Sequence, residues 1–211
     1  MKKKTFILSI ALFVAFIIWT VLVCLVDVRD VGPCGTNVGF ATLNSRFHSL
    51  TGVNWGLYVL TDWLGLVPFA VAGGFGVFGF IQLIRRGHIL KVDRSILALG
   101  VFYIAVIAVY ILFEIVHINY RPVLIHGNLE VSYPSSTTML AISVMPAAMI
   151  ELNSRIRHRT LRRCTSLLIC AFTVFMVAGR LISGVHWVSD IIGGALLSTG
   201  LLLMYQAFRE K

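Results

Sequence analysis

Apolar residues gather along this chain in long runs that are hydrophobic on every side, with polar residues between the runs. Runs of roughly 20 apolar residues have the length that a helix needs to cross a ~30 Å hydrocarbon core. We therefore predict an all-α protein, a six-helix transmembrane bundle. The predicted spans cover about 5–26, 56–84, 95–118, 136–152, 164–184 and 187–208.

The first two apolar runs have unusual features. The first follows Lys2–Lys4 as a signal peptide would, but it ends in Val26-Asp27-Val28-Arg29 without a small-residue cleavage site, so we expect it to stay as a span. The second contains Pro68 and a cluster of glycines, for which we expect a kink or a close helix contact. These glycines are Gly73, Gly74, Gly76 and Gly79.

The basic residues predict how the bundle is oriented. If each span crosses once, 14 of the 18 Lys and Arg residues fall on the side of both termini and 4 on the other side. The positive-inside rule then places both termini in the cytoplasm. Loops at about 27–55 and 119–135 and a short turn at 184–186 face outward, and the pattern over 38–50 predicts an amphipathic helix at the membrane interface.

Composition agrees with a membrane protein and limits the partners. The chain has 58% hydrophobic and 13% charged residues and a mean hydropathy of +0.89, and its net charge is +9. The basic residues lie between the spans, where topology and anionic lipids explain them, so we expect membrane lipids and no nucleic acid as partners. No repeat or long linker divides the chain, which predicts one domain over 1–211. Its short loops and compact size favour a plasma membrane. A homo-oligomer is left open.

The four cysteines do not form a disulfide framework, and we expect them to be buried apolar residues. No Cys and His pair has the close spacing of a zinc site. We therefore expect no metal and no cofactor.

Polar residues near the outer span ends are the candidates for chemistry, because ionisable groups are costly in a membrane. Two arginines could clamp a phosphate, while the hydroxyls and free N–H groups of a helix start could bind its oxygens. His186 and Asp190 are four residues apart, as a nucleophile and its orienting carboxylate would be on one helix face. The candidate phosphate ligands are Arg121, Ser135, Ser136, Thr137 and Arg180.

These segments resemble the three-part signature of the type 2 phosphatidic acid phosphatase (PAP2) superfamily, whose membrane branch has six spans. The matching residues are Arg121-Pro122, Pro134-Ser135, and Arg180 with His186 and Asp190 at the family's spacing. The resemblance implies that His186 attacks phosphorus to form a phosphohistidine and that Asp190 holds its imidazole. It also implies that Arg121, Arg180 and Ser135 bind phosphoryl oxygens at the extracytoplasmic face, without a metal.

The first and second parts of the signature are degenerate. Glu114 stands where the family has Lys, Thr137 where it has the histidine that protonates the departing oxygen, and Gly179 where it has Ser. Without that acid a lipid alkoxide leaves slowly, so we hypothesise a lipid diphosphate such as a polyprenyl diphosphate, or a substitute acid such as His126 or His117. Glu114 and Asp62 are interpreted as buried acids, for which structural pairing is favoured over a catalytic role. Glu114 either pairs with Arg121 or is protonated through burial.

Three functions follow from these patterns. The first is a membrane phosphatase that hydrolyses a phosphorylated lipid, either a lipid phosphate or a diphosphate. The second is a degenerate relative that binds or transports such a lipid without hydrolysis. The third is a structural membrane subunit that keeps only the scaffold.

Overall fold

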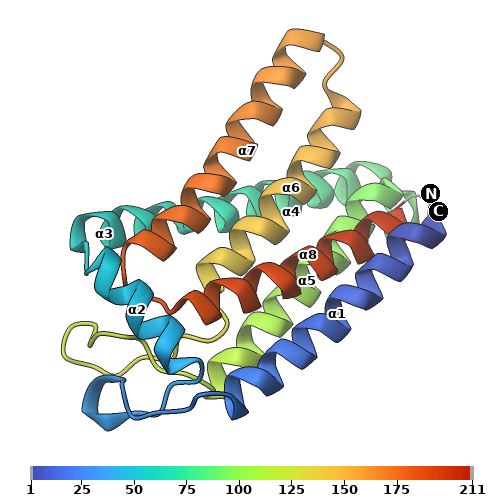
Figure 1. Cartoon of the computed structure of the whole chain (residues 1–211). Helices are drawn as coiled ribbons and strands as arrows, with labels where there is room; N and C mark the ends of the chain where they lie inside the picture. Colours follow the sequence, from blue (N-terminus) through green and yellow to red (C-terminus); the bar gives the residue numbers. More distant parts are fainter. Residues whose placement is uncertain (1, 210–211) are drawn as a thin grey trace.

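The computed structural model describes residues 2–209, which fold into α-helices joined by loops (Figure 1). The all-α prediction is confirmed, since this part of the chain has only isolated β-bridges and no strand. The helices are α1 (Lys2–Leu25), α2 (Ala41–Thr51), α3 (Trp55–Leu64), α4 (Leu66–Arg86), α5 (Arg94–Ile115), α6 (Ser136–Arg155), α7 (Arg159–Ile182) and α8 (Val188–Arg209), with short 3₁₀ turns at Pro33–Gly35 and Ile89–Lys91.

Helix α8 holds the bundle together. It packs along α1 and against α5 and α6, and α6 forms a hairpin with α7 that rises from the other helices (Figure 1). The start of α1 and the end of α8 meet at one end of the bundle, where the rings of Phe6 and Phe208 are 6.2 Å apart. The loops 26–40 and 116–135 and helix α2 gather at the other end.

Five helical segments have the length and hydropathy to cross a membrane, so the protein is a multi-pass membrane protein. They are Lys2–Leu25, Trp55–Arg86, Arg94–Ile115, Arg159–Ile182 and Val188–Arg209. The sixth predicted span, 136–152, is a helix in the structure but is not among the five. Most of α6 is buried against neighbouring helices rather than exposed to lipid, which explains why its side chains are less apolar.

The expected irregularity in the second span lies slightly before its proline. The helix is interrupted at Gly65, between α3 and α4. Pro68 has no N–H to donate to the carbonyl of Leu64, and its ring crowds that carbonyl. The glycine cluster contributes less than expected, because a Cβ at Gly73, Gly74 or Gly76 would meet nothing, and only Gly79 lies against α5.

The expectation that the four cysteines are buried is wrong. The cysteines are all exposed at the surface of the bundle, where the apolar side chains of a membrane protein face lipid rather than a core. Tyr133 and Trp187, two aromatic residues that lie close to predicted span ends, are buried. The Tyr133 hydroxyl lies 2.7 Å from that of Thr20, and the Trp187 indole N–H donates to the Tyr120 carbonyl.

Candidate active site

Two segments far apart in sequence meet at the loop-rich end of the bundle. Arg121 lies in the loop after α5, and His186 lies in the turn between α7 and α8. The Arg121 Nη1 atom is 3.2 Å from the His186 Nε2 atom, although 65 residues separate them. Both side chains are at least nine-tenths buried. The guanidinium and the imidazole could therefore contact one small group together.

The contact with Arg121 fixes the tautomer of His186. A guanidinium can only donate hydrogen bonds, so the Nε2 atom that faces it must carry a lone pair, and the proton of the neutral ring must sit on Nδ1. Burial and the positive charges of Arg121 and Arg180 hold the pKa of His186 well below its ordinary value. The ring is therefore neutral at physiological pH, with Nε2 able to act as a nucleophile.

Asp190 stands behind the imidazole, in the first turn of α8. Its Oδ2 atom is 3.7 Å from His186 Nδ1, slightly beyond hydrogen-bond length, as is common in catalytic pairs before substrate binds. The same carboxylate accepts hydrogen bonds from the Trp187 backbone N–H at 3.0 Å and from the Asn119 side-chain amide at 3.3 Å. These two donors hold the carboxylate in place.

The turn that carries His186 depends on Gly184. This glycine has φ of +69°, a conformation that side chains disfavour, and a Cβ there would lie 1.9 Å from the Gly52 carbonyl oxygen. The turn is joined to the segment before α3 by a hydrogen bond of 3.0 Å from the Asn54 N–H to the Ser183 carbonyl. Close backbone packing therefore sets the position of the imidazole.

Arg180 projects from the end of α7 and is held by two other helices. Its Nε and Nη2 atoms donate to the Thr137 hydroxyl at 3.0 and 2.8 Å, and Nη2 also contacts Asp62 on α3 at 2.9 Å. Its Nη1 atom is buried and has no partner in the described part of the chain. Thr137 thus faces an arginine, and Nη1 remains to bind an anion. Asp62 forms the structural pair that we expected, but its side chain is 57% exposed rather than buried.

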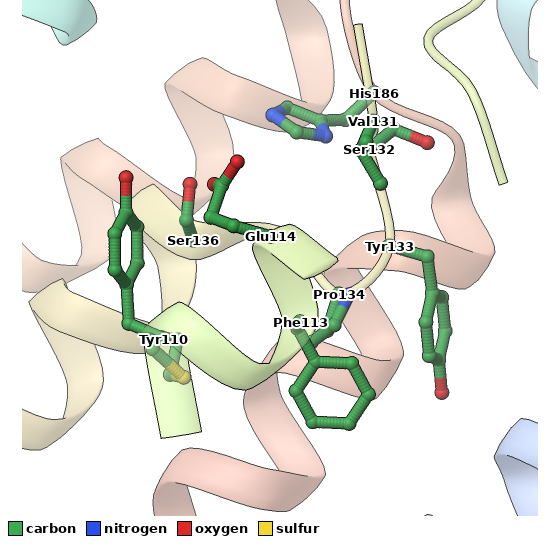
Figure 2. Close-up of a pocket in the computed structure, with 10 residues that line it drawn as sticks. Tyr110, Phe113, Glu114, Val131, Ser132, Tyr133, Pro134, Ser136 and His186 are labelled. Atoms are coloured by element: carbon green, nitrogen blue, oxygen red, sulfur yellow. The ribbon is translucent and has the colours of Figure 1, made fainter. Parts of the chain in front are cut away.

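The other two hydroxyls at the start of α6 have different surroundings. Ser135 is fully buried and caps the helix, since its Oγ accepts from the Thr138 N–H at 3.4 Å while its own N–H donates to the Asp190 carbonyl. Ser136 lines the pocket that contains His186 (Figure 2). Of the three hydroxyls, only that of Ser136 lines this pocket.

Glu114 does not pair with Arg121, contrary to our expectation. The Arg121 Nε atom instead lies 3.0 Å from Glu130, a residue of the same loop, and the two backbones are joined by a hydrogen bond from the Arg121 N–H to the Glu130 carbonyl. Glu114, near the end of α5, is exposed rather than buried as we expected, and it lines the small pocket beside His186 (Figure 2). The loop folds back on itself, which brings Glu130 closer to Arg121 than the helix brings Glu114.

The sequence did not point to Asn119 or Glu130. Asn119 is 2% exposed, and the feature that could have indicated it is an amide two residues before Arg121 in an otherwise apolar stretch.

Gly179, a departure from the signature, has a packing explanation: a Cβ there would lie 2.7 Å from the Thr61 side chain, so glycine lets α7 approach α3. In residues 2–209 no group of three or more His, Cys, Asp or Glu could hold a metal ion.

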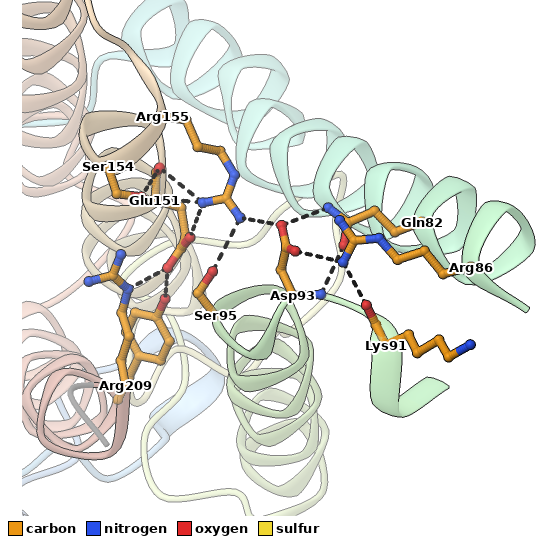
Figure 3. Close-up of polar contacts among 10 residues, drawn as sticks. Gln82, Arg86, Lys91, Asp93, Ser95, Glu151, Ser154, Arg155 and Arg209 are labelled. Atoms are coloured by element: carbon orange, nitrogen blue, oxygen red, sulfur yellow. Dashed lines mark hydrogen bonds and ion pairs between the residues drawn. The ribbon is translucent and has the colours of Figure 1, made fainter. Parts of the chain in front are cut away.

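A second charged cluster lies near the far end of α6, where Glu151 is about 22 Å along the helix from Ser136 at 1.5 Å per residue (Figure 3). Glu151, fully buried, receives hydrogen bonds from Arg155, from the Tyr205 hydroxyl and from Arg209. Arg155 extends the cluster to Asp93 at 3.4 Å. The charges of this cluster satisfy one another, and we interpret it as a clamp that joins α4, α5, α6 and α8.

Replacing Glu151 with alanine is expected to lower the free energy of unfolding by about 3–5 kcal/mol, because two arginines then lose a buried counter-charge. Thermal unfolding in detergent measures this loss. A Tyr205→Phe variant, which removes one hydrogen bond and little volume, is the matched control and should lose only about 1 kcal/mol. Equal losses in the two variants would contradict the clamp.

Comparisons with known proteins agree with this architecture. Residues 113–211, which include Arg121, Arg180, His186 and Asp190, match the model of the PAP2 superfamily. The fold is similar to the crystal structure of a transmembrane PAP2-type phosphatidylglycerolphosphate phosphatase from Bacillus subtilis, with a TM-score of 0.59 and 19% identity over 96% of each chain. No curated protein sequence matches the chain. Residues 113–211 thus match the PAP2 superfamily, and the fold of the chain is similar to that of a transmembrane PAP2-type phosphatase.

Proposed function

We propose that this protein is a membrane phosphatase that removes a phosphoryl group from a phosphorylated lipid through a phosphohistidine intermediate. The observation that carries the proposal is the 3.2 Å approach of Arg121 to His186 Nε2, with Asp190 behind the ring. A buried neutral imidazole whose lone pair faces a guanidinium is suited to attack a phosphorus atom that the guanidinium binds.

In the proposed first step, Nε2 of His186 forms a bond to phosphorus while the bond from phosphorus to the lipid oxygen breaks. The ring becomes positively charged, and Asp190 stabilises it through the Nδ1 proton. Arg121 and the free Nη1 atom of Arg180 bind the phosphoryl oxygens, where charge is spread in the transition state. Water then attacks the phosphohistidine, which releases phosphate and restores the ring.

The favoured substrate is a lipid diphosphate such as a polyprenyl diphosphate. Thr137 occupies the position of the family's proton donor, and its hydroxyl accepts from Arg180 instead. A threonine hydroxyl is far too weak an acid to protonate a lipid alkoxide. A phosphate leaving group needs less help from an acid, so a diphosphate bond should break more readily than a monoester bond.

The proposed site faces the extracytoplasmic side. The charged cluster around Glu151 and the basic segments that flank it lie at the opposite end of α6 from Ser136. The positive-inside rule assigns that basic end to the cytoplasm, which leaves the site at the outer surface.

Binding without hydrolysis is the second candidate, and one observation favours it. Each arginine of the site already has an acidic partner, Arg121 in Glu130 at 3.0 Å and Arg180 in Asp62 at 2.9 Å. These carboxylates reduce the positive charge available to a phosphate. A protein that only binds would retain a phosphorylated lipid but release no phosphate from it.

Phosphate release from purified protein distinguishes these functions. At neutral pH we expect a polyprenyl diphosphate to be hydrolysed about 10²-fold faster than phosphatidic acid, because the monoester lacks a strong acid to protonate its leaving oxygen. Both lipids are presented in the same detergent, with a His186→Ala variant as the control for contaminating phosphatases. Equal rates on the two lipids would refute the leaving-group argument. Lipid binding without any release would favour the second candidate.

A further inference from the structure

Helix α2 lies against the first turn of α8, the helix that carries Asp190 (Figure 1). Asn44 of α2, which is 1% exposed, faces Ser189 of α8, which is fully buried. The Asn44 Oδ1 atom accepts from the Ser189 N–H at 3.2 Å, and the Asn44 Nδ2 atom donates to the Ser189 hydroxyl at 2.9 Å. One amide therefore binds both the backbone and the side chain of a residue 145 positions away.

The start of α8 needs an acceptor from outside the helix. The N–H groups of a first helical turn have no partner within the helix, and a polar side chain just before the helix commonly accepts from one of them. In this chain that position is occupied by Trp187, whose indole can only donate and is bonded to the Tyr120 carbonyl. Asn44 supplies the acceptor from another segment. Its Nδ2 atom also donates to the Gly39 carbonyl at 2.7 Å, which fixes the orientation of the amide.

Ser189 directly precedes Asp190, so the position of the Asp190 carboxylate depends on the Ser189 backbone. The Asp190 Oδ2 atom accepts from the Trp187 N–H at 3.0 Å and lies 3.7 Å from Nδ1 of His186. The Ser189 carbonyl accepts from the Trp19 indole N–H at 3.1 Å, so α1 holds the same residue from another side. A shift in the first turn of α8 would therefore move the carboxylate relative to the imidazole.

We infer that Asn44 is a positioning residue of the active site, which keeps Asp190 aligned with the imidazole by holding the Ser189 backbone. This inference rests on the proposed phosphatase function, and Asn44 lies outside the matched residues 113–211. The two arginines that bind the phosphoryl oxygens in the proposed mechanism are held by other segments. Loss of Asn44 should therefore slow the chemical step and leave substrate binding largely intact. A displacement of about 1 Å at a reacting group costs up to about 10²-fold in rate.

An Asn44→Leu variant tests this role, because leucine has nearly the same shape as asparagine and makes no hydrogen bond. With a polyprenyl diphosphate in detergent we expect kcat for phosphate release to fall by about 10-fold or more, and KM to stay within about twofold of the wild type. Asn44→Asp keeps an oxygen that accepts from the Ser189 N–H, so it should retain most of the rate, since the two side chains cap helices about equally well. Asn44→Ser, whose side chain is too short to reach Ser189, should show the same loss of kcat and replaces Asn44→Leu if that variant does not fold.

Gln82→Met is the matched control, because Gln82 makes the same kind of contact at the opposite end of the bundle. Its amide donates to the Asp93 Oδ2 atom and accepts from the Asp93 N–H, both at 2.9 Å. Both variants should lower the unfolding temperature in detergent, but only Asn44→Leu should lower kcat. An unchanged kcat in Asn44→Leu, a loss in KM alone, equal losses in the two variants, or an Asn44→Asp rate as low as that of Asn44→Leu would overturn the inference while the phosphatase function stands. A wild type that releases no phosphate from either a lipid diphosphate or phosphatidic acid would overturn both.

Discussion

His186→Ala is expected to lower phosphate release by about 10⁴-fold or more, the largest effect of any single substitution in this protein, because it removes the group that forms the covalent intermediate. The rate should not be restored by higher substrate concentration, since the loss is in the chemical step. Brief exposure of the wild type to substrate labelled in the phosphoryl group, followed by an alkaline quench, should leave label on the protein, because phosphohistidine survives alkali. The variant should carry no label.

His186 is 3% exposed, so an alanine leaves a small cavity and folding must be checked in parallel. A His186→Gln variant fills most of that space and should be equally inactive. His88→Ala is the matched control, because this histidine caps a turn near the opposite end of the bundle, where its Nδ1 accepts from the Leu90 N–H. Label that remains on the protein without His186, or a rate within tenfold of the wild type, would rule out the covalent route through this residue.

Arg121→Ala should lower kcat/KM by about 10²–10³-fold, the range seen when a fixed donor to a developing negative charge is removed. Two effects combine. The phosphoryl oxygens lose a guanidinium, and the His186 ring loses the donor that keeps a lone pair on Nε2. Arg121→Lys restores the charge but not the planar fork, so we expect it to recover only part of the rate. Steady-state kinetics on the favoured lipid measure both variants.

Arg29→Ala is the appropriate control for this substitution. Arg29 forms an ion pair with Asp27 at 2.8 Å, but its side chain is 62% exposed and lies in the loop after α1, so its removal should leave the rate unchanged. A loss of less than threefold in Arg121→Ala would show that Arg121 does not contact the transferred group.

The helices of this fold could be predicted from the sequence because hydropathy and length are local properties. Each predicted span coincides with a helix, except that the second is divided into α3 and α4, and errors at the boundaries have local causes. Helix α7 begins at Arg159 rather than at 164 because basic residues are good helix formers and lie at a membrane surface without cost. Helix α6 was predicted as a span, but its hydropathy is weak because it is buried among neighbouring helices. Burial of this kind cannot be recognised from a local sequence pattern.

In the candidate site, too, some features could be predicted from the sequence and others could not. The short spacing of His186 and Asp190 keeps them close together, although His186 lies in the turn before α8 rather than on its helical face. The orientation of the spans brings Arg121 and Arg180 to the same end. The partners of each arginine could not be predicted, because they come from distant segments. Arg180 meets Asp62 across 118 residues and Thr137 across 43. Glu130 reaches Arg121 only because the loop turns back on itself.

By itself, therefore, the sequence determined a multi-pass helical membrane protein and the identity of its candidate nucleophile, since both depend on local periodicity and spacing. Only the tertiary structure decided that Thr137 holds an arginine, that Asn119 supports Asp190, and that Glu114 lines the same pocket as His186. The physical reason is that side-chain pairing depends on which helices pack together and how their loops close. Several arrangements of the same helices would satisfy the hydropathy pattern equally well.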